Sequence, residues 1–572
     1  MGRMMHRLYK TDRARDFDHE TDRYVRMQQI YETIDRQNYQ WVVVLVAGVG
    51  FFLDGYTLFA SNIALPMISY VYWHNEPGSS KTTFINIATL AGTVVGQVAF
   101  GFLADKRGRK KMYGVELVLL IVSTLGVTMA STGANNSMSI YAWLIWWRIA
   151  TGVAVGADYP LSAVITSEFA PTKHRARMLA SVFFMQPLGQ LAGNLVALIV
   201  VAATRSRINT DTVRAVDIMW RWVIGIGVIP GVVASLFRFA IPETPRYLLD
   251  IDNDPIKAEF DATTLFGSDQ QHVEMGSEFD APWDGTTLPK AASFSSYASA
   301  SGSPSFDEAG SITPNTEYTL HPPTFQSHWR VVWDDVVYYF WKEGNWRTLL
   351  GTSLAWMLLD FGFYGIQLSN PQFLAKTWGA LLIAFAPKLN RVHLQKFGFL
   401  ALACMFIAMG VMFITVHKEG PVAIVLYIIG QMLFNFGPNA TTYMLPAELF
   451  PTRYRATCHG ISAASGKIGS ILVELFTVYY NIGSTSTAVS STVRYGWILV
   501  VFSAAMIVGS IVTHFLIPSV QQKGRPTGRV CSDFFNEKER TLESLALGRL
   551  GESSRYAVRR TRSVHRLPTR RF

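Results

Sequence analysis

Ionisable side chains occur inside apolar blocks of this sequence, where a charge costs several kcal/mol and therefore indicates a function. They are Asp54, Glu116, Arg148, Asp158, Asp360, Lys467 and Glu474. Glu116 and Arg148 lie near the ends of their blocks, so an interfacial position stays open for both. Glu474 shares a helical face with Lys467, and pairing with a cation would explain it.

Two polar stripes at helical spacing accompany these charges. Gln186, Gln190 and Asn194 form one stripe, and Trp356, Asp360 and Tyr364 form the other. Residues at i, i+4 and i+8 share one face of a helix, and in lipid such a face must contact a cavity or another helix. Hydrogen bonding between helices is the alternative, and it explains the neutral stripe better than the charged one.

The residue types predict a site for an anion that carries protons of its own. Lys467 supplies a cation and Asp360 a carboxylate, and the neutral donors are Tyr159, Gln186, Trp356, Tyr364 and Asn439. The carboxylate would repel sulfate, whereas monovalent phosphate can donate its OH groups to it and accept from lysine and amide groups. Asp54 and Asp158 remain as proton carriers, because burial favours the neutral form of a carboxyl group. An organic acid stays possible on these grounds.

The composition indicates the class of chain that holds these residues. Of 572 residues, 49% are hydrophobic and 16% are charged, against about a quarter in soluble domains. The apolar residues gather in blocks of about 20, enough to cross a bilayer. The sequence therefore predicts a polytopic membrane protein and no enzyme. It contains no nucleotide-binding motif and no metal-ligand spacing, so we expect no cofactor.

Twelve candidate spans follow from the apolar blocks, of which the eighth is too short. They are 41–72, 84–104, 112–131, 140–164, 178–203, 220–241, 346–368, 378–387, 395–416, 421–445, 459–481 and 495–518. G-x-x-x-G pairs at Gly92/Gly96, Gly152/Gly156 and Gly189/Gly193 predict close helix packing.

An internal repeat divides the chain into halves. Residues 168–176 (EFAPTKHRA) match residues 448–456 (ELFPTRYRA). The repeat predicts an all-α fold of two parallel six-helix halves, with substrate bound between them. The expected divisions are a segment 1–40, a first half 41–241, a linker 242–345, a second half 346–518 and a tail 519–572.

The charge pattern predicts the orientation. The short loop 105–111 (DKRGRKK) carries five Lys/Arg, which places it and the N-terminus in the cytoplasm. The tail 519–572 carries 13 Lys/Arg against five Asp/Glu, and such a tail favours the anionic inner leaflet. We expect no nucleic-acid partner, because no binding module accompanies the basic residues.

The chain resembles the phosphate:H⁺ symporter family of the major facilitator superfamily. The resemblance covers most of 41–518 except 250–330 and 370–396, and GVAVGADYPLSAVITSE (152–168) and WMLLDFGFYGI (356–366) are among the matching stretches. It implies that Asp54 and Asp158 couple protons. It also implies that phosphate is bound by Tyr159, Gln186, Trp356, Asp360, Tyr364, Asn439 and Lys467.

Two positions depart from the family pattern. A second acid commonly stands three residues after the first-span aspartate, and here that residue is Thr57. The eighth span is shortened, so we expect a short, irregular or re-entrant segment at 370–396, a loosely packed second half and weakened transport.

The expected function is proton-coupled import of inorganic phosphate by alternating access, as a monomer in the plasma membrane. Two alternatives remain. One is a porter for another small solute such as a sugar or an organic anion, and the other is a sensor that binds phosphate without moving it. The pair of Asp360 and Lys467 argues against a neutral sugar.

Overall fold

The computed structural model describes residues 39–74, 81–171, 174–208, 210–240, 243–250, 333, 336–342, 344–366, 390–416, 421–481 and 488–518. Within these ranges the chain is helical and contains no strand. Nine helices among the described residues are long and apolar enough to cross a membrane. The predicted all-α membrane fold is confirmed.

The first half contains six predicted spans, and each coincides with helix. They are α3 (Trp41–Trp73), α4 (Lys81–Arg107), α5 (Arg109–Thr128), α6 (Ile140–Phe169), α7 (Arg175–Ile208) and the pair α8 (Thr212–Gly225) and α9 (Val228–Ala240). A 3-10 turn, η2 (Ala134–Asn136), precedes α6, and a short helix, α10 (Pro245–Asp250), follows α9.

The second half repeats this arrangement where the structure describes it. Its helices are α13 (Trp346–Ile366), α16 (Arg391–Val416), α17 (Pro421–Phe436), α18 (Pro438–Leu449), α19 (Arg455–Asn481) and α20 (Ala488–Leu516), preceded by the π-helical turn η3 (Tyr338–Lys342). The tenth span is broken between α17 and α18 at Gly437, because Pro438 cannot donate a helical hydrogen bond.

The shortened eighth span, 378–387, lies outside the described residues, which resume at Asn390. The irregular segment that we expected at 370–396 ends before Arg391, because residues 391–396 form the first turns of α16. For residues 370–389 the expectation stays a prediction.

Glycines let the helices of the first half approach at backbone distance. A Cβ on Gly92 would lie 2.2 Å from the carbonyl oxygen of Ile149, and one on Gly156 would lie 2.3 Å from that of Thr93. The pairs Gly92/Gly96 of α4 and Gly152/Gly156 of α6 therefore face each other. The prediction that these motifs serve packing is confirmed for both pairs.

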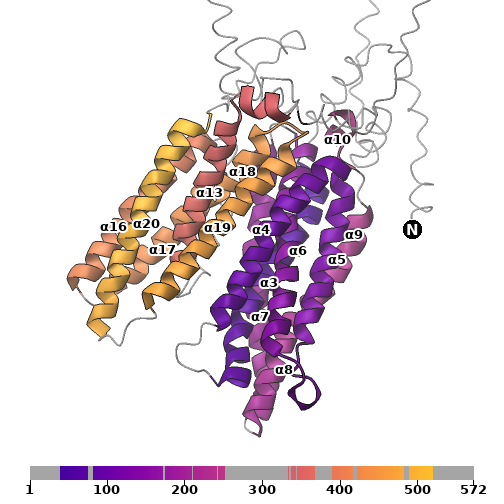
Figure 1. The fold of residues 1–572 in the computed structure, drawn as a ribbon, viewed down its shortest axis with the longest axis vertical. Helices are drawn as coiled ribbons and strands as arrows, with labels where there is room; N and C mark the ends of the chain where they lie inside the picture. The colour runs from indigo at the N-terminus through magenta and orange to yellow at the C-terminus, as the bar shows by residue number, and fades with distance from the viewer. Residues whose placement is uncertain are drawn as a thin grey trace, which may run out of the picture. The chain divides into compact units, whose positions relative to one another are not determined.

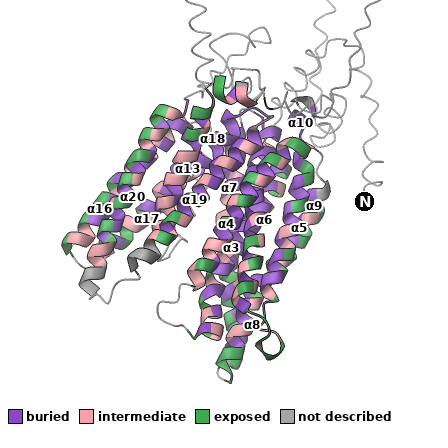
Figure 2. Cartoon of the chain, viewed as in Figure 1, coloured by how far each residue is buried: buried purple, intermediate pink, exposed green. Residues whose placement is uncertain are grey.

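Equivalent helices pack together in the two halves. The first and fifth helices of each half are partners, α3 with α7 and α13 with α19. Figure 1 shows the helices of residues 41–240 and those of residues 346–516 gathered in a bundle each. Helix α6 is buried along most of its length, whereas α16 carries many exposed residues (Figure 2). The large exposed residues of α7 and α16 are apolar. Such exposed apolar faces are what lipid-facing helices require.

Candidate functional site

A buried cation and carboxylate lie together at the centre of the candidate site. Lys467 Nζ on α19 donates to Asp360 Oδ2 on α13 at 3.0 Å and to the Tyr364 hydroxyl at 2.9 Å. The hydroxyl of Ser470 also approaches Asp360 Oδ2, at 3.3 Å. Lys467 is 5% exposed and Asp360 is 2% exposed. Two buried charges of opposite sign are stable only when paired in this way.

The first half adds an aromatic side chain and an amide to this cluster. Lys467 Nζ lies 5.6 Å from the centre of the Tyr159 ring on α6. The Tyr159 hydroxyl accepts a hydrogen bond of 2.7 Å from Gln186 Nε2 on α7. The groups therefore come from both halves, as a ligand site between halves requires.

Trp356 belongs to the same cluster. Gly466 precedes Lys467, and a Cβ on Gly466 would lie 2.4 Å from Trp356 Cδ1 and 3.0 Å from Asp360 Oδ2. The absence of a side chain at Gly466 lets the indole and the carboxyl group lie beside the lysine.

For three other predicted residues, the described structure gives hydrogen bonds to near neighbours in the chain. Asn439 donates to Asn435 Oδ1 at 3.1 Å, and Asn194 donates to the Gln190 carbonyl oxygen at 3.1 Å. Gln190 and Asn194 thus bond along their own helix. Asn439 as a phosphate ligand stays a prediction.

A second buried cluster surrounds the two aspartates predicted to carry protons. Asp158 Oδ1 on α6 accepts from Arg238 Nη2 at 3.0 Å, and Arg238 also forms an ion pair with Glu116 of α5. Asp54 of α3 lies close enough to Asp158 and Arg238 to interact with their charges. All four side chains are at most 2% exposed. Glu116 is therefore buried within the protein, and its depth in the membrane stays an open alternative.

The carboxyl groups of this cluster outnumber its cations. Three carboxyl groups, those of Asp54, Glu116 and Asp158, lie near one guanidinium group, that of Arg238. Sequence reasoning missed Arg238, whose signal was an arginine within the sixth apolar block.

Arg148 is also buried within the protein, with a neutral partner, and its depth in the membrane stays an open alternative. Its Nη1 donates to Ser61 Oγ at 2.5 Å, and its side chain lies on α6 with 4% exposure. Among the described residues no carboxylate pairs with it, and its Nε has no hydrogen-bond acceptor. Ser61 in turn donates to the carbonyl oxygen of Thr57, the residue that stands in place of the family's second acid.

We expect Ser61→Asp to stabilise the protein by about 1.5–3 kcal/mol, because it places a carboxylate on the Arg148 guanidinium. Ser61→Asn is the matched control, since it has the same shape without the charge. The measurement is the thermal unfolding midpoint of the purified protein in detergent. Equal midpoints for the two variants would contradict the idea that Arg148 lacks a counter-charge.

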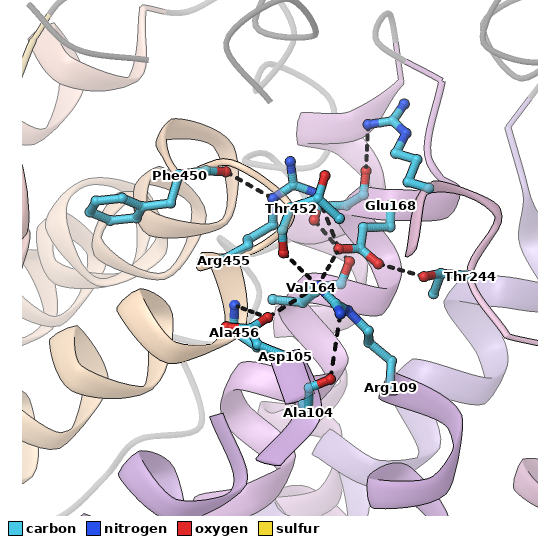
Figure 3. A network of polar contacts seen from close by, with 12 residues as sticks. Ala104, Asp105, Arg109, Val164, Glu168, Thr244, Phe450, Thr452, Arg455 and Ala456 are labelled. Atoms are coloured by element: carbon cyan, nitrogen blue, oxygen red, sulfur yellow. Dashed lines mark hydrogen bonds and ion pairs between the residues drawn. The ribbon is translucent and has the colours of Figure 1, made fainter. Parts of the chain in front are cut away.

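A third polar cluster joins the two halves at the end of the bundle that carries loop 105–111; we call it the interface network (Figure 3). Arg109 Nη2 donates to Glu168 Oε1 at 3.2 Å and to the carbonyl oxygen of Thr452 at 2.6 Å. Arg455 Nη1 donates to the same Glu168 oxygen at 3.3 Å. One carboxylate of the first half thus pairs with arginines of both halves.

Asp105 adds a contact with the backbone of the second half. Its carboxylate accepts from the backbone N–H groups of Ala456 and Thr457, at 3.2 and 2.7 Å, and from the Thr457 hydroxyl at 2.7 Å. Residues 456 and 457 lie in the first turn of α19. The interface network therefore closes one end of the contact between the halves.

The second half contains its own copy of the arginine–glutamate pair. Arg391 begins α16 as Arg109 begins α5, and Arg391 Nη2 lies 2.5 Å from Oε1 of Glu448, the repeat partner of Glu168. A second Arg391 bond, from Nε to Glu448 Oε2, measures 2.6 Å. Arg391 was missed because it lies in the segment expected to be irregular, although its spacing to Glu448 resembles that of Arg109 to Glu168.

The fold and these three clusters define a class: a helical membrane transporter with two homologous halves, a buried charged site between them and polar contacts that join the halves at one end. Residues 43–301 and 373–526 match the model of the sugar (and other) transporter family. The chain belongs to that family.

The names of the relatives are more specific than the name of the family. The chain is 36% identical to a repressible high-affinity phosphate permease of Neurospora crassa, over 89% of this chain and 90% of the relative. It is 34% identical to the inorganic phosphate transporter PHO84 of Saccharomyces cerevisiae, over 89% and 88%. The resemblance seen in the sequence is confirmed.

Among solved structures, the proton:xylose symporter XylE of the major facilitator superfamily has the same fold. The TM-score is 0.61 at 17% identity, and the match covers 84% of this chain and 97% of the other. This likeness concerns the fold of the two halves.

Proposed function

We propose that this protein imports inorganic phosphate together with protons by alternating access of the site between its halves. The observation that carries the proposal is the buried set of Lys467, Asp360 and Tyr364, completed from the first half by Tyr159. Lysine and hydroxyl groups donate to phosphate oxygens, and a carboxylate accepts from a phosphate OH group. The names of the curated relatives support the same substrate.

The proton sites in this proposal are Asp54 and Asp158. A proton bound to this pair offsets part of the negative charge that enters with phosphate. The excess of carboxyl groups over the single Arg238 supports this assignment. The protein would act as a monomer in the plasma membrane with both termini in the cytoplasm, in agreement with the basic loop 105–111 and the tail 519–572.

We expect phosphate uptake to rise as the external pH falls, because protonation of the aspartate pair precedes inward movement of the anion. Asp158→Asn removes one of the two titrating groups and should reduce this pH dependence. Radiolabelled phosphate uptake in a transport-deficient host, at a weakly acidic and a neutral external pH, measures both effects.

The matched control is Asp217→Asn. Asp217 is an acid of the first half whose carboxylate pairs with Arg221, outside the aspartate cluster. Its replacement should leave the pH dependence intact. Uptake by the unmodified protein that does not change with pH would remove proton coupling from the proposal, and absence of phosphate uptake at both pH values would remove import.

A further inference from the structure

Arg148 carries a buried charge for which the described part of the chain supplies no negative partner. The guanidinium group of an arginine stays protonated in a protein, and this side chain is 4% exposed. Among the described residues, no carboxylate lies close enough to act on its charge. A buried charge without a partner strongly destabilises a folded protein. A negative group from outside the chain would therefore find a favourable position beside Arg148.

One edge of this guanidinium group is open. Nη1 donates to Ser61 Oγ at 2.5 Å, whereas the buried Nε has no acceptor among the described residues. Ser61 donates its own proton to the carbonyl oxygen of Thr57 at 2.7 Å. Ser61 therefore supplies a neutral oxygen and no charge. The N–H groups along an open guanidinium edge suit an anion, because they can donate in parallel to one negative group.

Arg148 and Ser61 lie on helix faces that also carry residues of the two buried clusters. Arg148 precedes Tyr159 by eleven residues, so the two share a face of α6 and lie about three turns, or about 16 Å, apart. Ser61 follows Asp54 by seven residues, which is about two turns of α3. Glu168 of the interface network lies in the last turn of α6. Arg148 is therefore on the other side of Tyr159 from that network.

We propose that the first half contains a second anion site, in which Arg148 and the Ser61 hydroxyl bind a small inorganic anion. Monovalent phosphate and chloride share the required chemistry, since each brings one negative charge and accepts N–H bonds. Water can accept from Nε, but it brings no charge and leaves that of Arg148 uncompensated. The site is separate from the Lys467 cluster and does not depend on the proposed import of phosphate.

The test is the thermal unfolding midpoint of the purified full-length protein in detergent, as chloride or phosphate replaces gluconate at constant ionic strength. Gluconate is an organic anion that is too large for a buried position between two helices. Lys467→Gln is the background, because it removes the cation of the other site. The chloride series is repeated in the unmodified protein, so that the test does not depend on the folding of this background.

The midpoint should rise by about 2 °C or more over a roughly 100-fold increase in chloride or phosphate. The reason is that an anion that binds only the folded state stabilises it with the logarithm of the anion concentration.

Two substitutions should abolish this response for different reasons. Arg148→Met removes the charge and keeps a long unbranched side chain. Ser61→Asp supplies a fixed carboxylate, so its midpoint should already be high in gluconate and should not rise further. Ser61→Asn and Arg221→Met are the matched controls and should keep the response. The first adds no charge, and the second removes an arginine that pairs with Asp217.

The two ions identify the occupant. A rise with phosphate alone assigns the site to an oxyanion, a rise with chloride alone assigns it to a halide, and a rise with both assigns it to small anions in general. Each of these results supports the proposal. The absence of a rise with either ion would overturn it, and so would a rise that persists in both Arg148→Met and Ser61→Asp. Neither of these two results would affect the proposed import, which uptake and phosphate binding at the Lys467 cluster test separately.

Discussion

Lys467→Gln is expected to weaken phosphate binding about 100-fold. The change removes the cation of the site and leaves Asp360 buried without its partner. Breaking a buried ion pair by removing one member costs about 3–5 kcal/mol, and each 1.4 kcal/mol is about a factor of ten. Equilibrium binding of radiolabelled phosphate to the purified protein measures the effect independently of transport.

Asp360→Asn removes the negative charge of Asp360 and keeps the size and shape of the side chain. It keeps Lys467 and removes the negative charge, so phosphate binding should weaken less than in Lys467→Gln. Sulfate, which has no proton to donate to a carboxylate, should compete better in this variant than in the unmodified protein. Phosphate affinity unchanged in Lys467→Gln would exclude the cluster as the binding site.

Glu168→Gln is expected to loosen the closed end of the interface and to reduce net transport more than about tenfold. The variant leaves Arg109 and Arg455 buried near each other without their shared carboxylate, at a cost of several kcal/mol. Phosphate binding should change little, because no residue of the Lys467 cluster takes part in the interface network.

Cys458 offers a native reporter for this effect. It is a free thiol, fully buried on α19 next to Thr457. In a background with Cys404→Ser and Cys531→Ser, alkylation of Cys458 should become faster in Glu168→Gln. Glu448→Gln is the matched control, because its pair with Arg391 lies within the second half. Equal alkylation rates in Glu168→Gln and the unmodified protein would show that Glu168 does not hold this end closed.

The apolar spans and the close glycine contacts could be predicted from sequence, because hydrophobic length and G-x-x-x-G spacing are local properties. The pairing of Asp360 with Lys467 was also accessible, since each charge stands alone in an apolar block and needs a partner. Arg238 was not recognised, because an arginine near the end of a block normally extends toward the interface. Its role depends on Asp158 and Glu116, which come from other helices.

The role of Asn439 stays a prediction from its residue type and from the family resemblance. The tenth span that carries it is not one continuous helix, since α17 ends at Phe436 and α18 begins at Pro438. The interface network could not be predicted from the sequence, because most of its donors and acceptors in the second half are backbone groups, which every sequence supplies.

The Asp105 carboxylate of the first half caps a helix of the second half, because it accepts from the N–H groups of Ala456 and Thr457. The first-turn N–H groups of a helix need acceptors, and an aspartate usually supplies them from the same chain segment. Here α19 receives this cap from α4, so separating the halves also uncaps a helix, at a cost of about 0.5–2 kcal/mol. Amide hydrogen exchange at residues 456 and 457 should therefore report how often the halves separate at this end during the transport cycle.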